Sequence, residues 1–184
     1  AAHSAGSVYN NKKIGRHGKA VCFSFHPVKN LAMPTGGLIS INDPRYKKFK
    51  KLLMERRWCG ITSRKGTDYD VKEIGGNYYM NEFSAAIGIE QLKKLDKLNL
   101  SRKKIGKKFN EQINIKFKMP YNEDCSYHLY WILVKNRDEF REKLSKNGIE
   151  TGTHYKPIHL MSMYKQKQKL SISEKVGKQI VTLP

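Results

Sequence analysis

The fold of this chain is decided by one stretch, Val21-Cys22-Phe23-Ser24-Phe25-His26-Pro27-Val28-Lys29-Asn30-Leu31. Apolar and polar residues alternate over 21–26, which predicts a half-buried strand with a small polar face. Pro27 has no N–H to donate to a neighbouring strand, so we expect the strand to end there. Lys29 then lies just past the carboxyl end of a strand, where open α/β sheets bind ligands. A partly desolvated amine at that edge can lose its proton near neutral pH and attack a carbonyl.

Length and composition limit the class of protein. A chain of 184 residues with 39% hydrophobic content can form one ordinary domain or two small pieces of a larger one. It contains no apolar run of about 18 residues or more, so we expect no membrane span, and no secretory signal is visible. Cys22, Cys59 and Cys125 are widely spaced and odd in number, which indicates a reducing compartment, the cytoplasm, and no metal site. The six histidines show no zinc pattern either.

Patterns of apolar residues predict further helices and strands in the first part of the chain. A short strand is expected at 38–41, followed by a helix that Asp43 caps and Pro44 opens. The segment 59–76 has no periodicity and is expected to be a long loop. Asn81 is expected to cap a long helix that ends near residue 113.

After Pro120 a second structural unit is expected. The apolar run 128–134 predicts a buried strand, and Asn136 caps a helix that Asn147-Gly148 ends. The segment 149–155 predicts another strand. This succession of strand, helix and strand is typical of a compact α+β domain.

Four blocks stand out, in order, along the chain. They are Ala1-Ala2-His3-Ser4-Ala5-Gly6; Phe23-Ser24-Phe25-His26-Pro27-Val28-Lys29-Asn30-Leu31 with the following Gly36-Gly37; Gly75-Gly76-Asn77-Tyr78-Tyr79-Met80-Asn81-Glu82-Phe83-Ser84-Ala85-Ala86-Ile87-Gly88; and Gly148-Ile149-Glu150-Thr151-Gly152-Thr153-His154-Tyr155-Lys156-Pro157-Ile158-His159-Leu160. Together they resemble the signature of the DegT/DnrJ/EryC1/StrS family, sugar aminotransferases that use pyridoxal phosphate (PLP). The resemblance spans nearly the whole chain and corresponds to the C-terminal half of such an enzyme.

The resemblance implies an α/β protein, a fold-type-I PLP-dependent transferase with part of a three-layer α/β/α large domain and a small C-terminal α+β domain. Residues 1–80 would be the C-terminal part of the large PLP-binding domain, and residues 81–113 a long connecting helix. Residues 114–184 would be the small domain, which is incomplete. The family's carboxylate that pairs with the pyridine nitrogen would lie just before Ala1, so this chain would be a fragment.

The resemblance also implies four cofactor-binding residues. Lys29 would be the catalytic Schiff-base lysine, which bonds to the cofactor aldehyde and later carries a proton. Ser24 would bind the cofactor phosphate and His3 would lie near its phenolic oxygen, whereas Asn77 would reach across a homodimer interface to the second copy's phosphate. Without the family, Ser24 is an ordinary sheet serine, His3 a surface or satisfied core residue, and Asn77 a turn residue after two glycines.

Substrate contacts are implied in the fourth block. His154, Tyr155 and His159 would lie near a sugar-nucleotide pocket, although Tyr155 could also fill core and His159 could cap a turn. Tyr79 departs from the family, which often has arginine there, so the amino donor is left open. A lysine retained at Lys29 favours transamination over the related dehydratases, in which that lysine is replaced.

The expected function is conversion of a nucleotide-linked keto-sugar to an amino sugar, with glutamate as donor, for a polysaccharide, a glycan or a secondary metabolite. Two alternatives stay open. The net charge of +20 fits a basic nucleic-acid-binding module, but the basic runs 45–57, 93–108 and 165–169 lie mostly on polar helix faces and lack interleaved aromatics. The chain could also be a catalytically silent PLP-fold fragment, since the residue that pairs with the pyridine nitrogen lies outside it.

Overall fold

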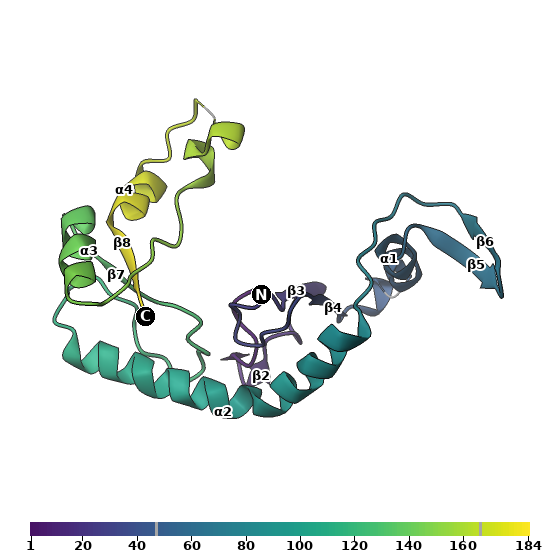
Figure 1. The fold of residues 1–184 in the computed structure, drawn as a ribbon, viewed down its shortest axis with the longest axis horizontal. Coiled ribbons are helices and arrows are strands. Elements are labelled where there is room, and N and C mark those ends of the chain that lie inside the picture. The colour runs from purple at the N-terminus through teal and green to yellow at the C-terminus, as the bar shows by residue number, and fades with distance from the viewer. Residues whose placement is uncertain (47, 166) are drawn as a thin grey trace. The chain divides into compact units, whose positions relative to one another are not determined.

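The computed structural model describes residues 1–46, 48–165 and 167–184. They form two compact units, Ala1–Leu100 with Asp124–Ser126 and Ser101–Glu123 with Tyr127–Pro184. The division falls inside helix α2 (Glu82–Gln112), which runs from one unit into the other (Figure 1). Among the described residues, the sheets are all two-stranded and antiparallel.

The N-terminal part of the first unit contains two hairpins. β1 (Val8–Tyr9) pairs with β2 (Lys12–Lys13), and β3 (Ala20–Ser24) pairs with β4 (Gly37–Ile41). The predicted strand at 38–41 is confirmed by β4. The strand predicted over 21–26 is shorter than expected, because β3 ends at Ser24.

Hydrogen bonds turn the chain away from β3 before it reaches the proline. Phe25 makes one more bond across the hairpin, donating its N–H to the Gly36 carbonyl at 3.0 Å. The Phe25 carbonyl then accepts the Met33 N–H at 2.9 Å, so residues 25–33 close into a loop. Leu31 and Met33 are 7% and 5% exposed and anchor this loop in the core of the first unit. The end of the strand is therefore set by hydrogen bonds and burial as well as by the missing proline N–H.

A short turn precedes the first α-helix. The helix expected from Pro44 begins as a 3-10 turn, η1 (Pro44–Tyr46), and α1 (Phe49–Arg57) starts later. Lys47, which belongs to the predicted helix, lies outside the described residues. The Asp43 carboxylate accepts the Arg45 N–H at 2.9 Å, so the expected cap is present on the 3-10 turn.

The prediction of a long loop over 59–76 is wrong, because this segment contains the hairpin of β5 (Ile61–Lys65) and β6 (Asp68–Val71). Gly66, with φ of +57°, lies in the turn between the strands, where a residue without Cβ avoids strain. Most side chains of both strands are exposed. The alternation of buried and exposed residues that identifies a strand in a sequence is therefore missing here.

Helix α2 confirms the long helix that the sequence predicts. The Asn81 side-chain oxygen accepts the Ser84 N–H at 2.8 Å, which is the expected N-cap. In the first unit the helix buries Asn99, which is 4% exposed. In the second unit Gly106 lies against Tyr127, where a Cβ would come within 2.8 Å of the tyrosine ring. The domain division expected at residues 80 and 113 stays a prediction.

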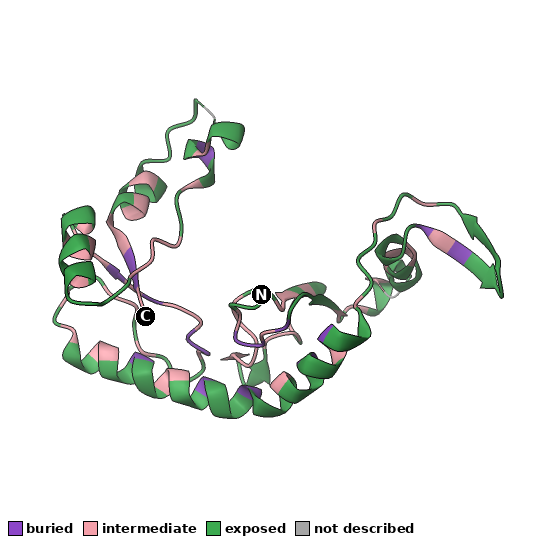
Figure 2. Ribbon diagram, viewed as in Figure 1, coloured by how far each residue is buried: buried purple, intermediate pink, exposed green. Residues whose placement is uncertain are grey.

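The second unit has a small core of its own. β7 (Tyr130–Leu133) lies within the predicted strand 128–134 and pairs with β8 (Ile180–Leu183). Ile132 and Val181, on the paired strands, are 1% and 0% exposed. Figure 2 shows buried residues on both strands, while the helices around them are mostly exposed or half-buried.

Helices complete the second unit. They are α3 (Arg137–Lys146), the 3-10 turns η2 (Ile158–Leu160) and η3 (Ser162–Tyr164), and α4 (Ser171–Gln179). α3 confirms the helix predicted there and its end at Asn147, but the predicted cap is wrong, because the Asn136 side chain makes no capping bond. The prediction of a strand over 149–155 is wrong. Within that segment only Gly152 makes a β-bridge, and its partner is Thr182 of β8. Arg141 donates to the Thr151 carbonyl at 2.8 Å, which takes that acceptor away from a strand ladder.

Candidate active site

Lys29 lies in the loop of residues 25–33 at the boundary between solvent and core. The three residues before it are exposed, Lys29 itself is half-buried, and Asn30 after it is only 4% exposed. The Lys29 N–H donates to the His26 carbonyl at 2.8 Å, which fixes the turn. The backbone of Lys29 is thus held on both sides, by a turn and by a buried neighbour.

Ser24 and His26 fold the chain that leads to Lys29. Ser24 Oγ accepts the His26 N–H and His26 Nδ1 accepts the Val28 N–H, both at 3.4 Å, which is long for a hydrogen bond. Ser24 is half-buried at the end of β3, opposite Gly37. Its oxygen accepts in this bond, so its own O–H is the group that can donate to a ligand oxygen. Ser24 therefore bonds to backbone, as an ordinary sheet serine does, and still carries a donor.

A buried polar cluster begins at the residue after Lys29. It consists of Asn30, Asn99, Ser126 and Ser7, and is called the Asn30 cluster below. The Asn30 amide donates to Asn99 Oδ1 and to the Ser126 carbonyl, both at 2.9 Å. The Ser7 hydroxyl donates to the Ser126 hydroxyl at 2.8 Å. The cluster joins the Lys29 loop, helix α2 and two other segments of the first unit.

The same cluster contacts the segment that carries His3. Asn99 Nδ2 donates to the Ala5 carbonyl at 3.0 Å, and Ser126 Oγ donates to the His3 carbonyl at 3.5 Å. His3 is half-buried. The Lys29 loop and the His3 segment are therefore joined by one set of buried bonds, and this link could not be inferred from their separation in the sequence.

Asn77 lies on the segment that follows β6 and is exposed. Its main chain pairs with Trp58 in an isolated antiparallel bridge. The nearby Tyr79 ring lies 5.8 Å from the Trp58 ring between centroids, and the Arg57 guanidinium lies 5.0 Å from the Tyr79 centroid. Asn77 thus has main-chain support and an exposed side chain. Arg57 was not found from the sequence, because it comes from α1 and shares no motif with Tyr79.

The three residues expected near a substrate all belong to the second unit. His154, Tyr155 and His159 line a surface hollow of about 700 Å³ that α4 also lines. His154 Nδ1 is 2.6 Å from Thr182 Oγ1, and its ring meets the Tyr155 ring edge-on, with 4.9 Å between centroids. Thr182 orients the His154 ring, and sequence reasoning missed it because β8 was not predicted.

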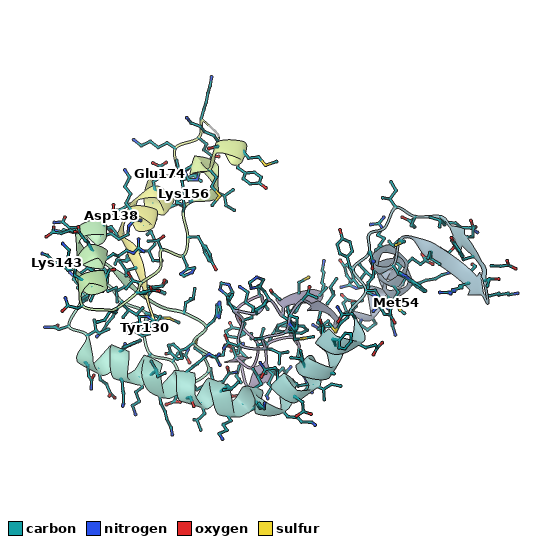
Figure 3. The ribbon with its side chains drawn as sticks, viewed as in Figure 1. Met54, Tyr130, Asp138, Lys143, Lys156 and Glu174 are labelled. Atoms are coloured by element: carbon teal, nitrogen blue, oxygen red, sulfur yellow. The ribbon has the colours of Figure 1, made fainter. Side chains whose placement is uncertain are left out.

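His159 is bonded to a carboxylate of α4. The His159 side chain is 9% exposed, and its Nε2 lies 3.3 Å from Glu174 Oε1. The same carboxylate oxygen accepts the Leu170 N–H at 3.0 Å. That backbone bond, followed by the His159 ring, holds the pKa of Glu174 below its usual value. Figure 3 labels Glu174 on α4, and the bond favours the alternative in which His159 fixes a turn.

The part of the chain that the structure describes contains neither a metal-binding group nor a disulfide. Within it, no three His, Cys, Asp or Glu side chains are arranged to hold a metal ion. Cys22, Cys59 and Cys125 are free thiols. None of the described helices combines the length and the hydropathy that a membrane crossing needs.

The chain is similar in sequence to sugar aminotransferases. The model of the DegT/DnrJ/EryC1/StrS aminotransferase family matches residues 1–184. The UDP-4-amino-4,6-dideoxy-N-acetyl-beta-L-altrosamine transaminase of Campylobacter jejuni is 34% identical over 90% of this chain and 46% of its own length. The chain spans about half the length of the curated relatives it matches.

Solved structures with the same arrangement of elements include two aminotransferase relatives. Helicobacter pylori PseC, an aminotransferase involved in the biosynthesis of pseudoaminic acid, matches 100% of this chain and 52% of its own, with a TM-score of 0.84 and 29% identity. Spr1654 of Streptococcus pneumoniae, in its PLP-form, matches 100% of this chain and 51% of its own, with a TM-score of 0.89 and 25% identity. The predicted fold class, an α/β fold-type-I transferase, is confirmed by these structures.

Proposed function

The chain belongs to the DegT/DnrJ/EryC1/StrS aminotransferase family, and on this premise we propose that the protein is a PLP-dependent aminotransferase. It converts a nucleotide-linked keto-sugar to an amino sugar. The names of the similar Campylobacter transaminase and of PseC support this substrate class. The observation that carries the proposal is the half-buried Lys29 on a loop that hydrogen bonds close, directly after the strand that carries Ser24.

The side chains of the first unit suit PLP chemically. An amine bonds covalently to an aldehyde, a hydroxyl donates to a phosphate, and an imidazole N–H donates to a phenolic oxygen. Lys29, Ser24 and His3 carry these three groups. The loop of Lys29 and the segment of His3 are also joined by the Asn30 cluster, so the donor set fits the cofactor.

Each of these residues has one task in the proposed reaction. PLP, when bound, supplies an aldehyde that takes up the amino group and a ring that withdraws electrons. Lys29 Nζ would hold the cofactor covalently through its aldehyde carbon, with loss of water, and the same nitrogen as a free amine would take up and return a proton. Ser24 Oγ donates to a phosphate oxygen. The His3 ring helps to hold the phenolic oxygen as an anion.

The second unit binds the sugar nucleotide in this proposal. His154, Tyr155 and His159 share one hollow, which supports a common ligand. The His154 ring is oriented by Thr182 through one nitrogen, and its other nitrogen is the atom proposed to meet the ligand. Tyr155 is 58% exposed, whereas His159 lines the hollow with a nearly buried side chain that is bonded to Glu174.

We also propose a homodimer with a shared active site, in which Asn77 of one copy binds the cofactor phosphate of the other. Asn77 is exposed, and Tyr78 and Tyr79 beside it are 78% and 55% exposed. Contiguous exposed apolar surface is a feature of interaction sites, so the two tyrosines support an interface here. Glutamate is the proposed donor, because the Arg57 guanidinium beside Tyr79 supplies a charge that suits a carboxylate.

The proposed location is the cytoplasm, and the proposed destination of the amino sugar is a polysaccharide, a glycan or a secondary metabolite. Three free thiols suit a reducing compartment. The nucleic-acid-binding alternative is not favoured, because the family and the relatives are sugar aminotransferases. The catalytically silent alternative predicts no turnover even where the cofactor bonds to Lys29, and the turnover measurement in the following experiment distinguishes it.

Borohydride reduction tests the proposal on the full-length protein loaded with PLP. We expect a yellow absorption that borohydride removes and a mass adduct on the peptide that contains Lys29. Lys29→Ala should abolish the adduct and lower turnover on the order of 10³-fold, because the covalent bond and the proton transfer are both lost. Lys72→Ala is the matched control, since Lys72 is an exposed lysine of the same unit that pairs with Asp70 at 3.3 Å. An adduct on another lysine, or salt-sensitive binding of DNA or RNA without a yellow cofactor, would refute the assignment.

A further inference from the structure

The core of the first unit contains buried polar side chains, and one of them, Asn30, directly follows Lys29 in the sequence. Asn30 and Asn99 are each 4% exposed, and Ser126 is 1% exposed. Burial of a polar group costs free energy unless protein hydrogen bonds replace the bonds to water. The Asn30 cluster offsets this cost with directed hydrogen bonds, because its amides donate to the main-chain carbonyls of Ser126 and Ala5.

The hydrogen bonds of the cluster have fixed directions. A carboxamide has two N–H donors in a planar fork, and Asn30 uses both, on Asn99 Oδ1 and on the Ser126 carbonyl, at 2.9 Å each. Asn99 accepts with its oxygen and donates with its nitrogen to the Ala5 carbonyl at 3.0 Å. The orientation of the Asn30 amide therefore sets the orientation of the Asn99 amide. The two amides connect the residue after Lys29 to the N-terminal segment.

Ser126 and Gly6 complete the connection to His3. The Ser126 N–H donates to Ser7 Oγ at 3.0 Å, and Ser126 Oγ donates to the His3 carbonyl at 3.5 Å. Gly6 lies so close to Asn99 that a Cβ at Gly6 would overlap the Asn99 Nδ2. The N-terminal segment is therefore held against the cluster by hydrogen bonds and by close packing.

We propose that Asn30 and Asn99 are positioning residues for the reaction, because they fix the backbone of Lys29 relative to that of His3. The inference rests on the proposed function, in which Lys29 bonds to the cofactor aldehyde and His3 faces the phenolic oxygen. Both interactions require a set geometry, and a misplacement of about 1 Å can cost about 100-fold in rate. Asn30 touches neither cofactor nor substrate in this role and acts through the adjacent Lys29.

The test uses the reactivity of the Lys29 amine in the full-length protein without cofactor. Trace labelling with an amine-specific reagent, read by mass spectrometry, gives the ratio of Lys29 labelling to Lys72 labelling. We expect a wild-type ratio that differs from one, because Lys29 is half-buried on a fixed loop while the Lys72 side chain is 68% exposed. A role in stability alone does not change this ratio while the protein stays folded.

The deciding variant carries Asn30→Leu together with Asn99→Leu. The double change removes both partners of the Asn30–Asn99 bond, but the Ser126 and Ala5 carbonyls lose their donors, so we expect a lower unfolding temperature. In the folded variant we expect a labelling ratio that moves toward one and a kcat about 100-fold lower, with little change in KM for the sugar nucleotide. Ser84→Ala is the matched control, because Ser84 is a serine of the same helix that is 1% exposed and lies outside the cluster.

A folded double variant that keeps the wild-type labelling ratio and kcat would overturn the inference, as would a wild-type ratio of one. Should the double variant fail to fold, Asn30→Ser takes its place, because it keeps one donor on a small side chain, and the same two outcomes apply. If the wild type gives no borohydride adduct on Lys29, the proposed function fails instead. The labelling ratio needs no cofactor, so the two failures are distinguishable.

Discussion

The Lys29 loop and the 154–159 segment hold their functional side chains in different ways. In the first unit, neutral amides that are almost fully buried hold the backbone next to Lys29. In the second unit, the Thr182 hydroxyl orients His154 and the Glu174 carboxylate binds His159. Amides and hydroxyls do not titrate near neutral pH or in acid, whereas a carboxylate does. The comparison indicates that the first arrangement is insensitive to acid and that the second is not.

The substitution with the largest expected effect on stability tests whether the two units have independent cores. Ile132→Ala removes a side chain of β7 that is 1% exposed, and we expect it to cost about 2–5 kcal/mol of unfolding free energy in denaturant titrations. The Lys29 labelling ratio should not change while the variant is folded. Ile89→Ala, at a position 58% exposed, is the control and should stay within about 0.5 kcal/mol of wild type. A changed Lys29 ratio in folded Ile132→Ala would show that the two arrangements are coupled.

Gly6→Ala tests the packing of the N-terminal segment on the Asn30 cluster. The added Cβ would overlap Asn99 Nδ2 at a backbone φ of +85°, so we expect a loss of about 1–3 kcal/mol and a shifted Lys29 labelling ratio. Gly18→Ala is a close control, because Gly18 also has a positive φ, +63°, but nothing within 4 Å of its added Cβ. Equal effects of the two substitutions would mean that backbone strain alone matters and that contact with Asn99 does not.

Thr182→Val tests the arrangement that orients His154. Valine keeps the shape and the main-chain pairing with Gly152 but removes the oxygen that lies 2.6 Å from His154 Nδ1. We expect a loss of about 1 kcal/mol in stability and a several-fold rise in KM for the sugar nucleotide, with kcat and the Lys29 labelling ratio unchanged. An unchanged KM would contradict the substrate role of His154.

The smallest expected effect is the acid dependence of the second unit. The Leu170 N–H, and next the His159 ring, lower the pKa of Glu174 in the folded protein from its usual 4.5. This contribution to stability is complete above about pH 4.5 and is lost as the pH falls through the lower folded value. Glu174→Gln should therefore reduce the acid dependence of stability below about pH 4.5 in thermal unfolding experiments.

A control for this acid dependence is available on the surface of α2. Glu90 pairs with Lys93 at 2.6 Å, and both side chains are more than half exposed. Glu90→Gln should leave the wild-type acid dependence in place, because exposed pairs contribute little. If Glu174→Gln also keeps the wild-type acid profile, the bond between His159 and Glu174 does not set the pH response of the second unit.

Local patterns predicted those elements that carry a strong signal of their own. Helix α2 was predicted because its cap, Asn81, and its apolar periodicity are visible in the sequence, and the capping bond is present. The hairpin within 59–76 was missed, because its strands are mostly exposed and lack alternation. The strand expected over 149–155 failed for the opposite reason. Its residues have strand propensity, but the chain end supplies β8 as the partner of β7.

The sequence by itself determined the family, the fold class and the side chains whose chemistry suits the proposed reaction, because motifs record which functional groups are present and in what order. Only the tertiary structure decided which residues hold those side chains in place. Asn99, Ser126, Thr182 and Glu174 are far in sequence from the residues they bind. A hydrogen bond between residues far apart in the sequence produces no periodicity or spacing in the chain. It can therefore be identified only from the folded structure.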